Sequence, residues 1–402
     1  MSTAPAPGLA RWFTPARLIE IVRDNPGITR AAAAAEVGIG TGAATDLMAR
    51  MRAAELLDET RAPAAGRGRP TTILQPHPAG PLVVAVELRI TGWRVAISDI
   101  GGAPQVLAES DSMPADYRVA FADIGAVVAD VCAQERRRVR VVSVSAAGAI
   151  HDGELAQFPM FDWSDIDMSL LTAQLPDRDM PILLGNDATL AGLAESRTGA
   201  ARGVGTVLHL MVAVGLGGAL IIDGVPVTGA HGGAGEYGHV PFGDPSQRCP
   251  CGAQGCWNLT IDGNALAAHL GDPPPTNPVR YARERLAARA EGTVVDPTAV
   301  DDPRVDAAFA EIASALGRGI AGLVNIHDPD AVTLGGLAGP FRAAALGAFD
   351  AAYRNGLMEF RKLLPPNVID GVHGDDGPLR GAALRGVDHV TTPDALAQWD
   401  RR

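Results

Sequence analysis

A glycine-rich segment ending at Trp257 constrains this 402-residue chain most, because it holds three of the four cysteines shortly after a histidine. The four groups are His239, Cys249, Cys251 and Cys256. Three thiolates and one imidazole complete the tetrahedral shell of a structural Zn²⁺ site and leave no position for water, and Gly252 and Gly255 allow the tight backbone this needs. The alternative is a disulfide or scattered free thiols, which the leftover Cys132 disfavours in a cytosolic chain. We therefore predict structural Zn²⁺.

The charge distribution indicates local contact with a polyanion. The net charge is −12, yet residues 1–80 hold nine Arg against seven Asp or Glu, whereas the remainder holds 25 basic and 39 acidic residues. An acidic body with a slightly basic head favours localised binding of nucleic acid. The first residues lack a basic region followed by an apolar run, so no secretory signal is expected. The uncharged run Val207–Ile222 is too short and too rich in glycine to span a bilayer. We expect a soluble, cytoplasmic protein without membrane partners.

The first 76 residues have the pattern of a winged helix-turn-helix. Thr14-Pro15 predicts a helix start, Thr29 caps a short second helix, and a third helix is expected over 41–54. Strands over 56–60 and 71–75 would form the wing. The turn between these strands contains three Arg and no acidic residue.

An Arg-rich flexible turn can lay guanidinium groups along phosphates or into a narrow minor groove, while the third helix enters the major groove. The predicted DNA contacts are Arg30, Thr41, Thr45, Arg50, Arg67 and Arg69. The alternative is a three-helix packing module whose Arg-rich turn is merely solvated.

The segment Gly-Glu-Tyr-Gly-His (235–239), followed by Cys-x-Cys-Gly-x-x-Gly-Cys, resembles the signature of the ROK family of repressors, open reading frames and kinases. A Gly-Arg-Pro at 68–70 is similar to that of ROK repressors. The resemblance implies a two-lobed, actin-like α/β fold, and the β-β-β-α-β order of apolar runs in each half fits it. We expect a winged helix-turn-helix domain over 1–76, a first lobe over 77–187 that begins with a linker, and a second lobe over 188–402 with the zinc loop and a dimerisation surface.

The resemblance also implies where a kinase would hold ATP, and here the chain departs from the family. ROK kinases have an Asp-x-Gly-x-Thr hairpin turn after the first strand of the body, but this chain has Glu87-Leu88-Arg89-Ile90-Thr91. A β-carbon and a guanidinium would fill the space that the phosphates need, so we predict that kinase activity is lost. Glycine pairs at 217–218 and 335–336 resemble the other nucleotide-binding turns, although tight strand turns explain them equally well.

By resemblance, the sugar-binding residues are Asn186, Asp187, Glu236 and His239. Asp187 holds the position of a vestigial catalytic base, and we assign no catalytic residue; its alternative role is a helix N-cap. Glu236 has the alternative role of bracing the zinc loop. Asn258 stands where family kinases have Glu, and Pro159-Met160 stands where they have Pro-Asn.

These patterns predict a ROK-type transcriptional regulator of carbohydrate-related genes, expected to be a repressor. Its expected partners are an inverted-repeat operator in double-stranded DNA, a sugar or sugar-derived effector, and a second copy in a homodimer or a tetramer. Two alternatives stay open. One is an active ATP-dependent sugar kinase that carries a DNA-binding head, and the other is a ligand-independent regulator with a vestigial pocket.

Overall fold

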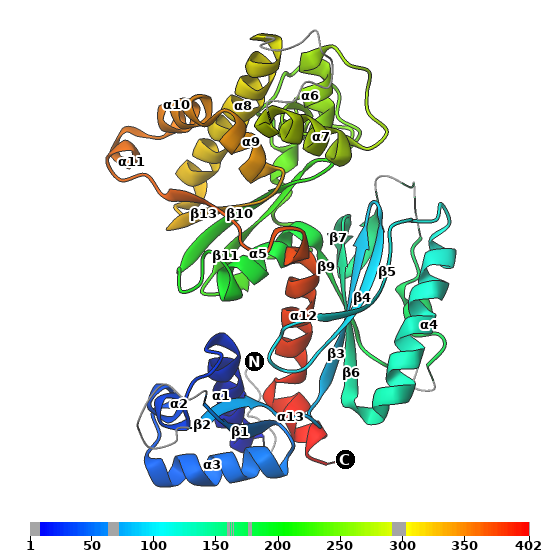
Figure 1. The fold of residues 1–402 in the computed structure, drawn as a ribbon, viewed down its shortest axis with the longest axis vertical. Coiled ribbons are helices and arrows are strands. Elements are labelled where there is room, and N and C mark those ends of the chain that lie inside the picture. Colours follow the sequence, from blue (N-terminus) through cyan, green and yellow to red (C-terminus); the bar gives the residue numbers. More distant parts are fainter. Residues whose placement is uncertain are drawn as a thin grey trace. The chain divides into compact units, whose positions relative to one another are not determined.

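Two five-stranded mixed sheets organise the chain, one in each of two compact units (Figure 1). The structure is a computed structural model, and it describes residues 9–62, 72–158, 161, 163, 165–175, 179–291 and 303–401. Unit 1 comprises Met1–Asn186 with Leu379–Arg402, and unit 2 comprises Asp187–Pro378. This is the predicted two-lobed, actin-like α/β fold preceded by a winged helix-turn-helix head.

The head of unit 1 has the predicted helices and wing strands. Its elements are η1 (Ala10–Trp12), α1 (Phe13–Asp24), α2 (Arg30–Val37), α3 (Thr41–Ala53), β1 (Leu57–Arg61) and β2 (Thr72–Pro76). The Thr29 hydroxyl accepts a hydrogen bond from the amide of Ala32, which caps α2, and Gly38 ends it in the left-handed conformation. Helical structure begins at Ala10, earlier than the Thr14 start predicted, through the short η1 turn. β1 and β2 pair antiparallel as the wing.

The first-lobe sheet of unit 1 has the order β5-β4-β3-β6-β9. Its strands are β3 (Leu82–Arg89), β4 (Gly92–Ser98), β5 (Gln105–Ser110), β6 (Val139–Ala146) and β9 (Ile182–Asn186), and the other elements are α4 (Tyr117–Glu135), η2 (Arg136–Arg138), β7 (Ala149–His151), β8 (Glu154–Gln157) and η3 (Met168–Leu171). Because successive side chains of a strand point to opposite faces, Val84 and Val86 pack in the cluster that includes α4, whereas Val83 faces a second cluster. Burial on both faces explains the continuous apolar run of β3.

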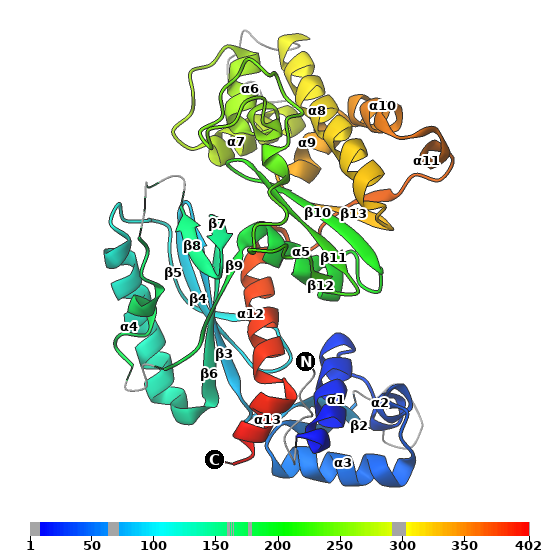
Figure 2. The ribbon, with the colours of Figure 1, turned by 180° about the vertical axis from the view of Figure 1, so that it is seen from behind.

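The last two helices complete that second cluster. They are α12 (Gly377–Val390) and α13 (Pro393–Trp399), and both views show α13 beside α1 (Figures 1 and 2). Val387, Leu396 and Trp399 share one core with head residues such as Leu18 and Met51. The predicted second lobe, 188–402, therefore differs from the observed division, because residues 379–402 belong to unit 1.

Charged and polar contacts reinforce the junction between the head and the last helices. The Arg23 side chain is only 3% exposed and forms ion pairs of 2.8 Å with Asp24 and 2.7 Å with Asp388. The indole Nε1 of Trp399 donates to the carbonyl oxygen of Ala54 at 2.7 Å. The head therefore shares its core with the first lobe, although residues 77–81 had the composition of a linker.

Unit 2 is built on the sheet β12-β11-β10-β13-β14, with α8 as its core helix. Its strands are β10 (Thr206–Val212), β11 (Leu216–Ile222), β12 (Val225–Pro226), β13 (Ala331–Gly336) and β14 (Asn367–Asp370). Its helices are α5 (Asp187–Thr198), η4 (Tyr237–His239), η5 (Trp257–Thr260), α6 (Gly263–Leu270), α7 (Pro278–Glu291), α8 (Pro303–His327), α9 (Ala338–Ala344), α10 (Leu346–Gly356), α11 (Glu359–Leu363) and η6 (Gly374–Asp376). Among the described residues, α8 alone is long and apolar enough to cross a membrane, but 67% of its most apolar window is buried, as in the core helix of a globular unit.

Candidate functional site

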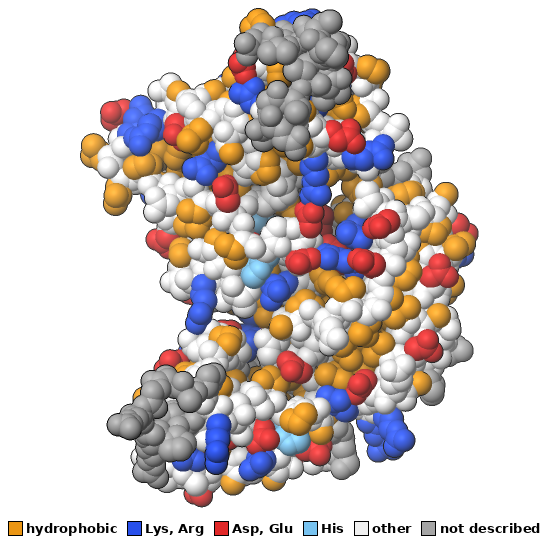
Figure 3. All heavy atoms as spheres, viewed as in Figure 1, with side chains coloured by type: hydrophobic (Ala, Val, Ile, Leu, Met, Phe, Trp, Pro, Cys, Tyr) orange, Lys and Arg blue, Asp and Glu red, His pale blue; other side chains and the backbone are white. Residues whose placement is uncertain are grey.

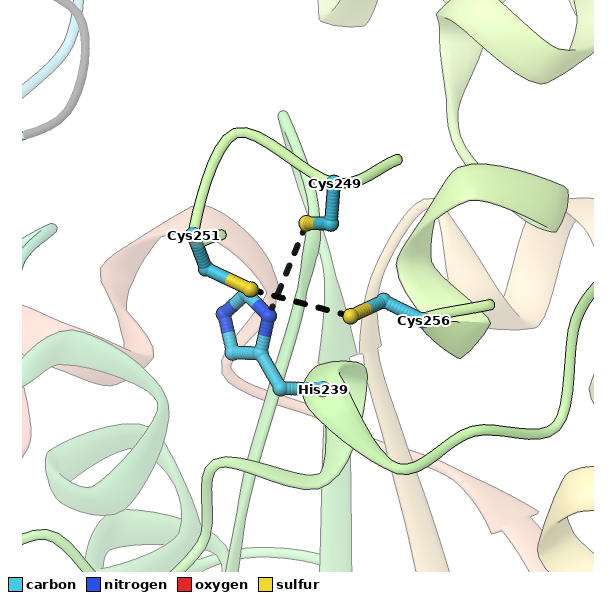
Figure 4. A group of neighbouring side chains, drawn as sticks. All are labelled: His239, Cys249, Cys251 and Cys256. Carbon is cyan, nitrogen blue, oxygen red and sulfur yellow. Dashed lines mark hydrogen bonds between the residues drawn. The ribbon is translucent and has the colours of Figure 1, made fainter. Parts of the chain in front are cut away.

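Unit 2 brings the four predicted metal ligands together (Figure 4). Their ligand atoms all lie within 4.8 Å of one another. The Sγ atoms of Cys251 and Cys256 are 3.7 Å apart, and Cys249 Sγ is 3.8 Å from His239 Nδ1. Tetrahedral Zn²⁺ with Zn–S bonds of about 2.3 Å separates its sulfur ligands by about 3.8 Å. The observed separations therefore fit this ion.

The backbone of the cysteine loop is shaped by two glycines in the left-handed region. Gly252 has φ 97° and Gly255 has φ 67°, values that L side chains rarely adopt. The Cys249 amide donates to the carbonyl oxygen of Ala253 at 2.8 Å, and the Gly255 amide donates to that of Gln247 at 2.9 Å. These bonds fold the loop back on itself, so that its thiols converge on the imidazole.

The thiols of the cluster disfavour one another's ionisation. Burial, followed by the neighbouring thiols, raises the pKa of Cys256 to about 12. A thiol with this pKa stays protonated at neutral pH unless a cation stabilises its thiolate. Cys249 and Cys256 are buried, whereas Cys251 is exposed, so an ion would be shielded on one side by the body of unit 2.

His239 connects the cluster to Glu236, the residue predicted to accept sugar hydroxyls. Its Nδ1 faces the sulfurs, while its Nε2 lies 3.9 Å from Glu236 Oε2. A carboxylate beside the second nitrogen of a metal-binding histidine orients the ring and raises its basicity. The side chains of Glu236 and His239 are 46% and 38% exposed. This geometry agrees with the bracing role that the sequence left open for Glu236, and leaves part of its carboxylate accessible.

Asn258 also lies at the cluster, with its Oδ1 3.9 Å from Cys249 Sγ. A Cβ placed on Gly215 would approach the Asn258 amide nitrogen at 3.5 Å. Asn258 therefore occupies the space between the cysteine loop and the β10–β11 turn. The sequence showed that Asn258 replaces the family's Glu, but it did not show that Asn258 would lie between the cysteine loop and the β10–β11 turn.

The two remaining predicted ligand residues lie where β9 ends and α5 begins. Asn186 Nδ2 donates to the Gly148 carbonyl oxygen at 3.1 Å. Asp187 Oδ1 accepts from the amide of Ala188 at 2.8 Å, at the first turn of α5. Asp187 is thus the first residue of α5, and this bond reaches only the next amide, whereas an N-cap side chain accepts from the second or third helical amide. The division between the units falls between these two residues, so Asn186 belongs to unit 1, and the other three belong to unit 2. Pro159 and Met160 lie outside the described residues.

A network of charged side chains lies at the turn that would cradle ATP phosphates in a kinase. Glu87 is 3% exposed and accepts from Arg94 Nε at 2.6 Å. Arg89 Nε lies 3.9 Å from the same carboxylate, and Arg89 Nη2 lies 3.8 Å from Asp111. Sequence reasoning missed Arg94, although the hairpin register that pairs Glu87 with Arg94 follows from a two-residue turn at 90–91.

The glycine pairs of the other two candidate nucleotide turns are required by packing. A Cβ on Gly218 would lie 2.5 Å from the carbonyl oxygen of His209, and one on Gly217 would lie 2.7 Å from the Ala188 side chain. Gly336 has φ 59°, and a Cβ there would lie 2.1 Å from the Val212 oxygen. Sheet packing therefore accounts for both pairs without a nucleotide.

The head presents one face of α3 to solvent. Thr41, Thr45 and Arg50 are exposed, while Leu47 and Met51 are buried, so the helix packs on one side. The Thr45 hydroxyl donates to the Thr41 carbonyl oxygen at 3.0 Å, and Arg50 Nη2 donates to the Arg11 carbonyl oxygen at 3.0 Å.

Arg30, the predicted contact on α2, forms an ion pair of 3.1 Å with Glu59 of the wing. Its guanidinium thus already has one partner within the head. Arg67 and Arg69 of the Arg-rich turn lie outside the described residues.

Comparison with known proteins agrees with this geometry. A glucokinase of Streptomyces coelicolor is 27% identical over 321 residues, which cover 74% of this chain and 98% of that protein. The xylose repressor of Caldicellulosiruptor bescii is 28% identical over 204 residues, 50% of this chain and 51% of that protein. The crystal structure of a ROK family transcriptional regulator, described as a homologue of the E. coli MLC protein, has the same fold, with a TM-score of 0.72 and 20% identity over 98% of this chain and 99% of that chain. The ROK family model matches residues 96–385, and the chain therefore belongs to the ROK family.

Proposed function

We propose that this chain is a cytoplasmic, DNA-binding transcriptional regulator of carbohydrate-related genes, controlled by a sugar or sugar-derived ligand and without kinase activity. The observation that carries the proposal is the winged helix-turn-helix whose exposed helix α3 is mounted on a ROK body. Nearly the whole length of the similar glucokinase aligns with only 74% of this chain, whereas the regulator aligns over 98% of it. This difference in coverage supports a regulator with an additional domain over a kinase. By analogy with the xylose repressor, repression is the expected direction of control.

The charged network at the turn after β3 supports the loss of kinase activity. A kinase needs backbone and metal around the phosphates of ATP, with room for both. Here Glu87 is already neutralised by Arg94, and the bulky Arg89 stands where ROK kinases have glycine. The glycine pairs at 217–218 and 335–336 are explained by sheet packing, so they do not by themselves indicate a nucleotide site.

Zinc has a structural role in this proposal. His239, Cys249, Cys251 and Cys256 would hold it, and the ion would supply a cross-link for a loop with few apolar side chains. Because His239 is adjacent to Glu236, that cross-link also fixes the carboxylate offered to sugar hydroxyls. A charged acceptor with nearby neutral donors suits polyol recognition. The candidate effector contacts are Asn186, Asp187, Glu236 and His239.

The DNA-binding role is tested by selecting genomic fragments with the purified protein and measuring affinity for the recovered sites by fluorescence anisotropy. We expect an inverted repeat, since two winged heads would read two half-sites. The affinity should fall steeply with salt because counterions are released from the phosphates. Specific affinity no greater than that for unrelated DNA would refute the proposal.

The kinase alternative is tested with a coupled assay that contains ATP, Mg²⁺ and a panel of hexoses and amino sugars. Turnover of about 1–100 per second would show a working kinase and overturn the interpretation of the β3–β4 turn. Turnover at the level of a no-enzyme control is the expected result.

The ligand-independent alternative is tested with the same sugars in melting experiments. A sugar at 100 times its dissociation constant should stabilise the protein by about 2.7 kcal/mol. It should also change the operator affinity. If no sugar does either, the protein regulates without this class of effector.

A further inference from the structure

Unit 2 carries an apolar arm, residues 358–364, between α10 and β14. Figures 1 and 3 show α11 on a loop that extends away from the sheet of unit 2, with apolar side chains at its tip. The exposed fractions are 87% for Leu363, 84% for Leu364, 61% for Phe360 and 44% for Met358. Ile326, near the end of α8, is 67% exposed. Such a concentration of large exposed apolar side chains is uncommon on a monomeric protein and marks an interaction surface.

The arm is held in place at its base. Asn325 Nδ2 donates to the Gly356 carbonyl oxygen at 2.9 Å, and the Met358 amide donates to Asn325 Oδ1 at 3.1 Å. The Tyr353 hydroxyl donates to the Pro366 carbonyl oxygen at 3.0 Å. The arm is therefore anchored on both sides by polar contacts, and its apolar side chains are presented without help from a partner. A preorganised surface of this kind loses little conformational entropy on binding.

The charges around the arm cancel within one chain. Arg361 pairs with Asp328, and Lys362 pairs with Glu359 at 3.0 Å. The guanidinium of Arg361 also lies over the Phe360 ring, 5.2 Å from its centroid. A surface with no net charge can face an identical copy of itself without repulsion. The chain after position 80 has a net negative charge, with 39 acidic against 25 basic residues, so a neutral surface is better suited to meeting an identical copy than a surface with the average charge.

The exposed area matches what one side of a dimer needs. If a fully exposed aliphatic side chain offers about 100 Å² of apolar surface and a Phe about 200 Å², the five exposed fractions correspond to roughly 400 Å². Interfaces are about 60% apolar, so the buried area would be roughly 670 Å² per partner. This is close to the ~800 Å² per partner of a standard specific interface.

We propose that the 358–364 arm, together with Ile326, is the surface on which a second copy of this chain docks, with the two arms packing against each other. This deepens the proposed function, on whose homodimer it rests, by naming the residues that join the copies. It also predicts that the two-fold axis of the dimer passes near the arm, so that equivalent residues of the two copies lie close together.

The test is sedimentation of the zinc-loaded full chain as wild type, as the double variant Leu363→Asp with Leu364→Asp, and as the control Val225→Asp, which changes a side chain 60% exposed on β12 of the same unit. We expect wild type and Val225→Asp to be dimers and the double variant to be a monomer, with a dimer dissociation constant weakened at least 100-fold. Unchanged zinc content and melting temperature would show that the variant is folded. A dimeric double variant, or a monomeric wild type at micromolar concentration, would overturn the proposal.

Cross-linking provides a second, positive measurement that does not depend on disrupting the fold. Leu364→Cys should give a dimeric product with a short bismaleimide, whereas Val225→Cys should not. Equal cross-linking of the two variants would place the interface elsewhere.

DNA binding separates failure of the interface from failure of the proposed function. If the double variant keeps its affinity for a half-site but loses the added affinity for the inverted repeat, both stand. If wild type binds its operator and responds to sugar as a monomer, the regulator remains and the arm proposal fails.

Discussion

Replacement of Trp399 by alanine should destabilise the head, although Trp399 lies on α13, 345 residues further along the chain than Ala54. Trp399 is 2% exposed, and its core neighbours include α1 and α3 side chains such as Leu18 and Met51. Removal of a buried aromatic side chain typically costs about 3–5 kcal/mol. The variant also leaves the Ala54 carbonyl without its indole donor, 2.7 Å away in the wild type, which costs about 1 kcal/mol more.

We therefore expect the Trp399→Ala variant to lose about 5 kcal/mol of unfolding free energy in unit 1. For a unit of this size, each kcal/mol lowers the melting temperature by about 2–4 °C, so the expected decrease is about 10–20 °C. The Trp399→Phe variant keeps the ring but not the donor and should lose about 1–2 kcal/mol. Gln398→Ala changes an exposed neighbour on the same helix and serves as the control, with a change within about 0.5 kcal/mol.

The assay is urea unfolding followed by circular dichroism, together with zinc content and operator affinity. Zinc content should not change, because the metal cluster belongs to unit 2, whereas operator affinity should fall with the stability of the head. If Trp399→Ala melts within about 2 °C of wild type, or if the head of the wild type unfolds in a separate transition before the rest of unit 1, the shared core does not exist as described.

Three further predictions concern zinc, pH and salt. Cys251→Ser should lower zinc content and melting temperature together, because one of four ligands is lost; a metal-free variant with wild-type stability would contradict a structural ion. His209 is 1% exposed, and burial lowers its pKa from 6.5 to about 4, so the unfolded chain takes up this proton first as pH falls. The free energy of unfolding should therefore decrease by about 3 kcal/mol as the pH falls from about 6.5 to 4. If the pH dependence of this free energy is unchanged in His209→Gln, other groups cause the decrease. Arg67→Ala with Arg69→Ala should weaken operator binding and flatten its salt dependence, whereas Arg118→Ala, on α4, should not; an unchanged salt slope in the double variant would remove the turn from the DNA contacts.

Local patterns in the sequence were sufficient for the metal cluster and for most secondary structure. The spacing of the cysteines and the two glycines that shape their loop are encoded within one short segment, so their convergence could be read directly. The same holds for the α2 cap at Thr29. The division between α9 and α10 at Ala345 was not predicted from the sequence.

Long-range packing was not readable from the sequence. Helix α13 is amphipathic and would suit many surfaces, and only the folded chain shows that Trp399 meets Ala54 across 345 positions. The assignment of residues 379–402 to the second lobe followed chain order, whereas the side chains of Val387 and Leu396 pair with the head. Likewise, Glu87 was recognised as a departure from a kinase, but its neutralisation by Arg94 depends on strand register.

The shared core also determines when the head is completed during synthesis. A ribosome adds about 5–20 residues per second, so roughly 17–70 s separate the appearance of Ala54 from that of its indole partner. Throughout that interval the nascent head lacks the side chains of α13 and must rely on its own few helices or on chaperones. On the proposed function, the head that would bind DNA is synthesised first but reaches its complete fold only after the whole body has been made.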